Sequence, residues 1–179
     1  MQKVKLDRID RRLLHDLQAE GRITNVELSK RAGISAPPCL RRVRALEDAG
    51  FIRSYHACLD PKALGFHVTV FAQVGLSSQA EADLEAFEAT VQDWNEVREC
   101  FMLAGETDFL LKIVAPDWDA YQTFLTTKLT AAHNVSHVKS SLSIRSAKIA
   151  PGVPIALEGP QNADGGNGEI EGNGAEPEV

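Results

Sequence analysis

Residues 23–46 read ITNVELSKRAGISAPPCLRRVRAL, and this stretch decides the fold of the first part of the chain. Thr24 is placed to cap a helix, and Glu27, three residues later, would complete a capping box that satisfies free backbone N–H groups. Gly33 predicts the end of this helix, because glycine adopts a left-handed conformation at little cost.

A second helix is predicted directly after this turn. Ser35 is expected to cap it, and Pro37 and Pro38 fall in its first turn, where missing N–H groups do little harm. Two helices joined by a tight glycine turn form a helix-turn-helix, whose second helix can enter the major groove of DNA. The stretch therefore predicts a DNA-reading unit.

The second helix has one apolar side. At 100° per residue, Leu40, Val43 and Leu46 gather on this side, with Cys39 nearby. We expect this side to face the protein core.

The same helix carries three arginines within four residues, Arg41, Arg42 and Arg44. Arg41 points away from the apolar side and the other two flank it, and arginine can bind guanine edges and phosphates. The alternative is a solvated basic face, although only Arg44 has an acidic residue, Asp48, four positions on. The candidate DNA-contacting residues are Thr24, Ser35, Pro37, Pro38, Arg41, Arg42 and Arg44.

The regions on both sides of this stretch complete a first domain over residues 1–59. Upstream, a third helix is predicted from apolar residues at spacings of three and four, Leu6, Ile9, Leu13 and Leu17. Downstream, FIRSYHACL at residues 51–59 mixes apolar and polar residues in the way of a short hairpin arm. The first domain is therefore predicted to be a winged helix-turn-helix.

The pattern changes after a connector at residues 60–65, and a second domain is predicted over residues 66–150. Strand patterns and helix patterns follow one another in the order β-α-β-β-α-β, which is the ferredoxin-like arrangement. The expected strands are 66–76, 96–105, 108–115 and 134–148, and the expected helices are 77–94 and 117–129. The fold class is α+β.

In a ferredoxin-like domain both helices cover one face of the sheet. We expect the other face to carry Phe71, Cys100, Met102, Leu110 and Val114. That set is too apolar to face water, so a partner is expected to cover it. A twofold dimer through this face would also pair two DNA-reading units.

Charge is distributed unevenly along the chain, whose net charge is −6. Residues 1–58 hold 12 Lys and Arg against 7 Asp and Glu, whereas residues 59–150 hold 7 against 12. Residues 151–179 hold 6 acids, 7 glycines and 4 prolines, with no basic or aromatic residue, and are predicted to be a disordered acidic tail. The basic charge is thus concentrated where the helix-turn-helix lies.

The sequence gives no sign of a metal, redox or nucleotide site. The three cysteines are widely spaced and form neither a C-x-x-C motif nor a disulfide framework. There is no P-loop, no G-x-G-x-x-G after a strand and no G-x-S-x-G. No signal peptide or membrane-spanning run is present, so we expect a cytoplasmic protein without a membrane partner or a prosthetic group.

The order of these parts resembles the Lrp/AsnC family, the leucine-responsive or feast/famine transcription regulators. The resemblance is carried by LDRIDRRLLHDLQAEGRITNVELSKRAGIS at 6–35, CLRRVRALEDAGFI at 39–52 and EVRECFMLAGETDFLLKIVAPDWDAYQTF at 96–124. It implies a DNA-binding regulator with an ACT-like second domain, dimeric and often octameric, which binds a small amino-acid effector between subunits. The acidic tail departs from the family pattern.

The resemblance also implies an effector site. The family's G-D-x-D-Y turn is present as Gly105-Glu106-Thr107-Asp108-Phe109, with departures at Glu106 and Phe109. Asp108 would hold the α-ammonium group, and Gly105 would leave backbone amides open to a carboxylate. The implied effector-binding residues are Gly105, Glu106, Thr107, Asp108, Ser140 and Ser141. The alternative interpretation of the turn is a simple hairpin connection.

Two other functions remain open at this point. A sirohaem decarboxylase resembles the same family, although an enzyme has no need of an arginine-rich helix. An architectural protein would bind DNA without any effector. A visible spectrum with the tetrapyrrole would identify the enzyme, and titration with amino acids would identify the architectural protein.

Overall fold

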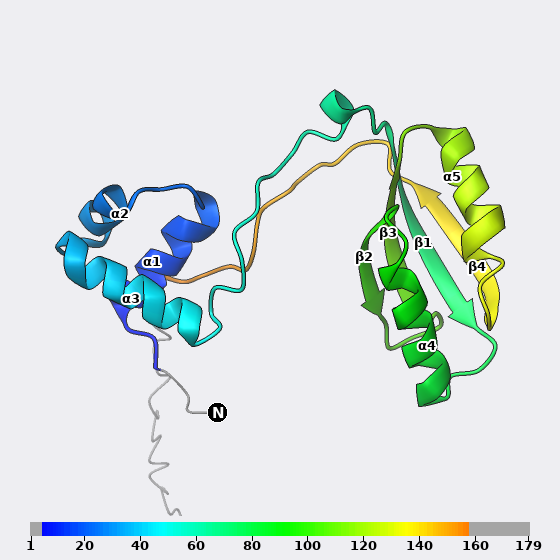
Figure 1. The fold of residues 1–179 in the computed structure, drawn as a ribbon, viewed down its shortest axis with the longest axis horizontal. Helices are drawn as coiled ribbons and strands as arrows, with labels where there is room; N and C mark the ends of the chain where they lie inside the picture. Colours follow the sequence, from blue (N-terminus) through cyan, green and yellow to red (C-terminus); the bar gives the residue numbers. More distant parts are fainter. Residues whose placement is uncertain (1–4, 158–179) are drawn as a thin grey trace, which may run out of the picture. The chain divides into compact units, whose positions relative to one another are not determined.

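The computed structural model describes residues 5–157, which form two compact units (Figure 1). Within the described residues, the first unit takes in residues 5–57 together with 150–157, and the second takes in residues 58–149. The first unit thus contains a short stretch from the segment predicted to be a disordered tail. Residues 158–179, the remainder of that prediction, lie outside the described residues.

The first unit is built from three helices, α1 (Arg8–Ala19), α2 (Asn25–Ala32) and α3 (Ala36–Asp48). The side chain of Thr24 accepts the N–H of Glu27 at 3.2 Å and caps α2 as predicted. The Glu27 side chain makes no return bond, so only half of the predicted capping box forms. Gly33 ends α2 at φ 70°, the left-handed conformation expected there.

Helix α3 presents a face to the core that differs from the predicted one. Its buried residues are Cys39, Val43 and Leu46, whereas Leu40 is 40% exposed. These three buried residues, spaced by four and then three positions from Cys39, form the inward row of the helix and pack with Leu13. Ser35 is the N-cap residue of the helix as predicted, but its side chain makes no capping hydrogen bond.

The segment after α3 does not form the expected hairpin. Residues 51–60 contain no strand and no ladder partner among the described residues. A single turn of 3₁₀-helix, Lys62–Leu64, interrupts the connector, and Gly65 ends it with φ 83°. An extended segment therefore follows the three helices.

The second unit has the predicted β-α-β-β-α-β order. Its elements are β1 (Val68–Leu76), α4 (Glu81–Gln92), β2 (Val97–Met102), β3 (Phe109–Ala115), α5 (Trp118–Phe124), a π-helical turn (Leu125–Leu129) and β4 (Val135–Leu142). The sheet is antiparallel throughout, with strand order β2-β3-β1-β4, as a ferredoxin-like fold requires. Phe87 of α4 and Phe124 of α5 share the core with Val74 and Leu111, so both helices cover the same face of the sheet.

The opposite face of the sheet is apolar, but its membership differs from the prediction. Cys100 pairs with the core residue Leu111 and packs against the core, whereas Phe101 pairs with Leu110 on the open face. Met102, opposite Phe109, also lies on the helix side in this register. A register shift between Val97 and Glu99 reverses which side chains face outward. The apolar residues of the open face are Phe71, Phe101, Leu110 and Val114.

None of the helices within residues 5–157 combines the length and the apolar character that crossing a bilayer would need. In the same residues, no three His, Cys, Asp or Glu side chains gather in a way that would suit a metal ion.

Candidate functional site

Helix α3 presents two of its three arginines to solvent. Arg41 and Arg44 are exposed and form no ion pair with any described residue. Arg42 is different, because its Nη1 donates to Asp7 Oδ2 at 2.8 Å and to Asp10 Oδ1 at 2.7 Å. The two exposed guanidinium groups are therefore free to meet an anion, and Arg42 is held against the start of α1.

The contact made by Arg42 shifts the pKa values of Arg42 and Asp7. Hydrogen bonds to Asp10 and then Asp7 raise the pKa of the Arg42 guanidinium above its ordinary value. The backbone N–H of Asp10, followed by Arg42, holds the pKa of the Asp7 carboxyl below its ordinary value. Asp7 also caps α1 through a complete capping box with Asp10. This charged cluster joins α3 to α1.

The remaining DNA-contact candidates lie where α2 and α3 begin. Thr24 and Ser35 are the N-cap residues of these two helices, and Pro37 and Pro38 occupy the first turn of α3. The two helix starts are held together because Asn25 Nδ2 donates to the carbonyl oxygen of Ala36 at 2.9 Å. Helix N-termini carry free N–H groups and positive partial charge, which suit phosphate oxygens.

In the second unit, the turn before β3 has an open part and a buried part. Gly105 and Glu106 are exposed and Thr107 is half-buried. The backbone N–H groups of residues 104–107 make no hydrogen bond with any described residue. Four free donors in one turn suit a carboxylate.

Asp108, which the resemblance implies would hold the α-ammonium group, is buried and already accepts a backbone hydrogen bond. It is 9% exposed, and its Oδ2 accepts the N–H of Leu76 at 2.7 Å. The backbone N–H of Asp108 donates to Val74, and its carbonyl oxygen accepts the N–H of Leu103. Asp108 therefore ties the turn to the end of β1.

The two serines implied for the effector site lie on opposite faces of the sheet. Ser140 pairs with Ala72 on the helix face, and its hydroxyl is hydrogen-bonded to that of the buried Tyr121. Ser141 pairs with Phe71 on the open face. Within one chain, the two serines cannot line the same surface.

A close approach beside the turn was missed in the sequence. A Cβ atom on Gly75 would lie 1.9 Å from Cε1 of His137, so the imidazole ring lies directly against the glycine backbone. The hydroxyl of Ser136 donates to the carbonyl oxygen of Gly75 at 2.8 Å. A glycine inside a strand pattern is the sequence signal for such an approach. His137 is exposed and lies at this end of the sheet.

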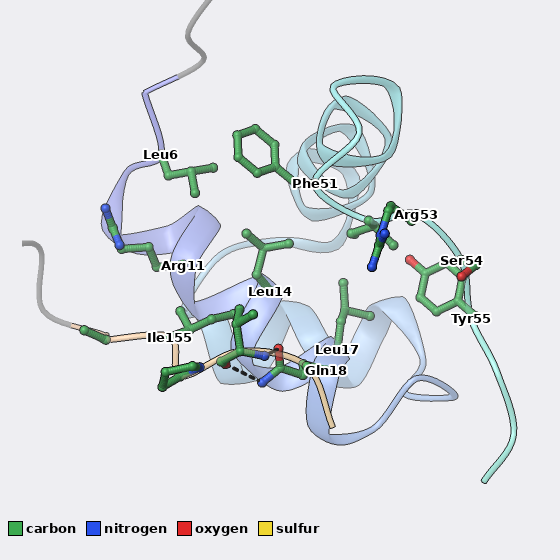
Figure 2. A pocket seen from close by; sticks show the side chains of 15 residues that line it. Leu6, Arg11, Leu14, Leu17, Gln18, Phe51, Arg53, Ser54, Tyr55 and Ile155 are labelled. Atoms are coloured by element: carbon green, nitrogen blue, oxygen red, sulfur yellow. Dashed lines mark hydrogen bonds between the residues drawn. The ribbon is translucent and has the colours of Figure 1, made fainter. Parts of the chain in front are cut away.

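The first unit contains a groove of about 730 Å³ beside α1, which Figure 2 shows. Residues 152–156 lie along it over the α1 side chains Leu14 and Leu17, and Phe51 and Tyr55 line its other part. Burial, with a hydrogen bond to Glu47, raises the pKa of Tyr55 to about 12. This groove is not predicted from the sequence, because residues 152–156 of its wall belong to the segment predicted to be a disordered tail.

Comparisons with known proteins agree with both units. Residues 6–53 match a family model described as winged helix-turn-helix DNA-binding, and residues 69–153 match the Lrp/AsnC ligand binding domain. The leucine-responsive regulatory protein of Rhizobium meliloti is 52% identical over 153 residues, which cover 86% of this chain and 98% of that protein. The protein of the same name from Salmonella typhimurium is 43% identical over 143 residues, covering 80% and 87%.

Solved structures show the same likeness. A transcriptional regulator of Neisseria meningitidis, in complex with L-Met, superposes with a TM-score of 0.80 at 40% identity and covers 84% of this chain and 97% of that one. An AsnC family transcriptional regulator from Agrobacterium tumefaciens gives a TM-score of 0.78 at 33% identity, covering 83% and 97%.

Proposed function

The chain belongs to the Lrp/AsnC family of DNA-binding transcription regulators, and from this premise we propose that Arg41 and Arg44 read its DNA sites. The observation that carries this proposal is that both side chains are exposed on α3 without an ion pair to any described residue. Thr24, Ser35 and the two prolines would lie against the phosphates and set the orientation of the helix. Arg42 pairs with two carboxylates and would act in the fold and not at the bases.

Replacing either exposed arginine should weaken specific DNA binding. We expect Arg41→Ala or Arg44→Ala to cost about 1–3 kcal/mol at a site recovered from fragmented genomic DNA, because a bidentate base contact is lost. Anisotropy titrations at fixed salt would measure this. Arg22→Ala is the matched control, since Arg22 is exposed and lies outside α3. Equal losses in all three variants would remove α3 from base recognition.

The second unit is proposed to bind a small amino acid. The free N–H groups of residues 104–107 would hold the carboxylate, and the exposed Glu106 would face the ammonium group. His137 lies at the same end of the sheet. The structural neighbour in complex with L-Met and the relatives named leucine-responsive favour an apolar side chain. Thermal-shift titration with the twenty amino acids tests this, and no response to any of them would favour an effector-independent protein.

The relatives also decide between regulator and enzyme. They are named as transcription regulators, and the first unit matches a DNA-binding domain, so the chain is a non-enzymatic regulator and not a tetrapyrrole decarboxylase.

A homodimer through the open face of the sheet is proposed as the form that binds DNA, with larger assemblies such as an octamer built from it. Phe71 is 39% exposed and Phe101 51% exposed, and a monomer would leave both rings in water. Two DNA-reading units held by one interface would suit paired half-sites.

A charge placed in this face should separate the subunits. We expect Phe101→Asp to give a folded monomer, because a carboxylate cannot be buried against the apolar partner face. Light scattering after size exclusion would measure the mass. Met102→Asp is the control, since Met102 is 60% exposed but lies on the helix side of the strand. A Phe101→Asp protein with unchanged mass would contradict the proposed interface.

A further inference from the structure

The segment that follows the second unit is anchored on α1 by a matched pair of hydrogen bonds. The N–H of Val153 donates to Gln18 Oε1 at 2.9 Å, and Gln18 Nε2 donates to the carbonyl oxygen of Val153 at 2.8 Å (Figure 2). Gly152 makes this approach possible, because a Cβ atom there would lie 2.0 Å from Gln18 Oε1 and its φ is +68°. The Gln18 amide thus bonds both backbone groups of Val153, as a residue of a neighbouring β-strand would.

The described chain then reaches a second, basic groove. Leu157 lines a groove of about 290 Å³ together with Arg8, Arg12 and Arg31. Arg12 is paired with Asp16, and Arg31 with both Glu20 and Glu27. Arg8 is exposed and makes no ion pair with any described residue. The last described residue therefore lines a groove that contains three guanidinium groups, and of these only that of Arg8 lacks a described counter-charge.

The sequence that continues from this groove has the complementary charge. Residues 158–179 hold six acids and no Lys, Arg or His. Residues 1–58 carry a net charge of +5, so the acidic segment has enough charge to cancel that of the DNA-binding unit. Both family matches end before this segment, at residues 53 and 153.

We infer that residues 158–179 bind the arginine groove of their own chain and restrain DNA binding electrostatically. The anchor at residues 152–157 fixes one end of the segment at the groove. A tethered ligand of this kind has an effective concentration on the order of millimolar, so weak ion pairs suffice to hold it. DNA phosphates and the segment would compete for the same positive unit, and each would weaken the binding of the other.

Removing the segment should strengthen DNA binding. A chain ending at Leu157 is expected to bind a labelled random-sequence duplex roughly tenfold more tightly than the full chain at about 50 mM salt, with the difference lost as salt screens the charges. A full-length variant with the six acids changed to Gln or Asn should behave like the shortened chain. Unchanged affinity after either change would overturn the inference.

A double-mutant comparison separates binding at the groove from a general effect of negative charge. In an Arg8→Ser background the gain from removing the segment should fall to about threefold or less, because one groove cation is missing. An Arg22→Ser background keeps the groove and should keep the full gain, since Arg22 lies outside it. An equal gain in the two backgrounds would show that the segment acts only through its total charge and would overturn the assigned site.

Discussion

Leu46→Ala should lower the free energy of unfolding of the helical unit by about 2–5 kcal/mol, whereas Leu40→Ala on the same helix should cost about 0.5 kcal/mol. Leu46 is 3% exposed and packs with Leu13, so its truncation leaves a cavity. Leu40 is 40% exposed and loses few contacts. Hydrogen exchange of the α1–α3 amides in increasing denaturant would measure both values. Equal losses would show that the predicted Leu40 face is the core face after all.

Asp108→Ala should lower the free energy of unfolding of the second unit by about 1–3 kcal/mol, because the buried N–H of Leu76 loses its acceptor. Asp108→Asn should cost less, since an amide oxygen can still accept that bond. Both tryptophans, Trp94 and Trp118, lie in this unit, so their fluorescence follows its unfolding.

Glu106→Ala is the matched comparison for Asp108. Its side chain is exposed, so we expect no loss of stability, but the thermal shift produced by an amino acid should disappear if Glu106 faces the ammonium group. If Asp108→Ala is stable but no longer responds to the amino acid, Asp108 and not Glu106 binds the effector. The two neighbouring carboxylates are thus expected to separate folding from ligand binding.

Local signals in the sequence predicted most of the fold. The cap at Thr24 and the left-handed Gly33 depend on residues within four positions, so the sequence contains the whole interaction. The inward row of α3 depends instead on how α1 packs against it. Cys39 and Leu40 differ by 100° around the helix, and the pattern alone accepts either of them.

The orientation of side chains in the sheet also could not be predicted from the local sequence. The shift of register between Val97 and Glu99 moves every later residue of β2 to the other face, so Cys100 faces the core and Phe101 faces outward. Nothing in the local sequence marks this irregularity. Simple alternation along β2 would therefore place Cys100 and Met102 on the open face, where the structure has Phe101.

The candidate sites depended on contacts between residues distant in sequence. Arg42 donates hydrogen bonds to Asp7 and Asp10, more than thirty residues upstream. The carboxylate of Asp108 accepts the backbone N–H of Leu76. Composition and spacing could place these residues on the correct elements. Composition and spacing could not show that the side chains of Arg42 and Asp108 already have hydrogen-bond partners within the chain.

The return of residues 150–157 to α1 makes the DNA-binding unit a discontinuous domain, with the ligand-binding unit inserted between its two pieces. A fragment cut after residue 57 would lack the second piece and expose the apolar side chains Leu14 and Leu17. An independently soluble DNA-binding module would instead need residues 150–157 rejoined through a short linker. The inserted unit is therefore joined to the DNA-binding unit by two connecting segments, one before it and one after it.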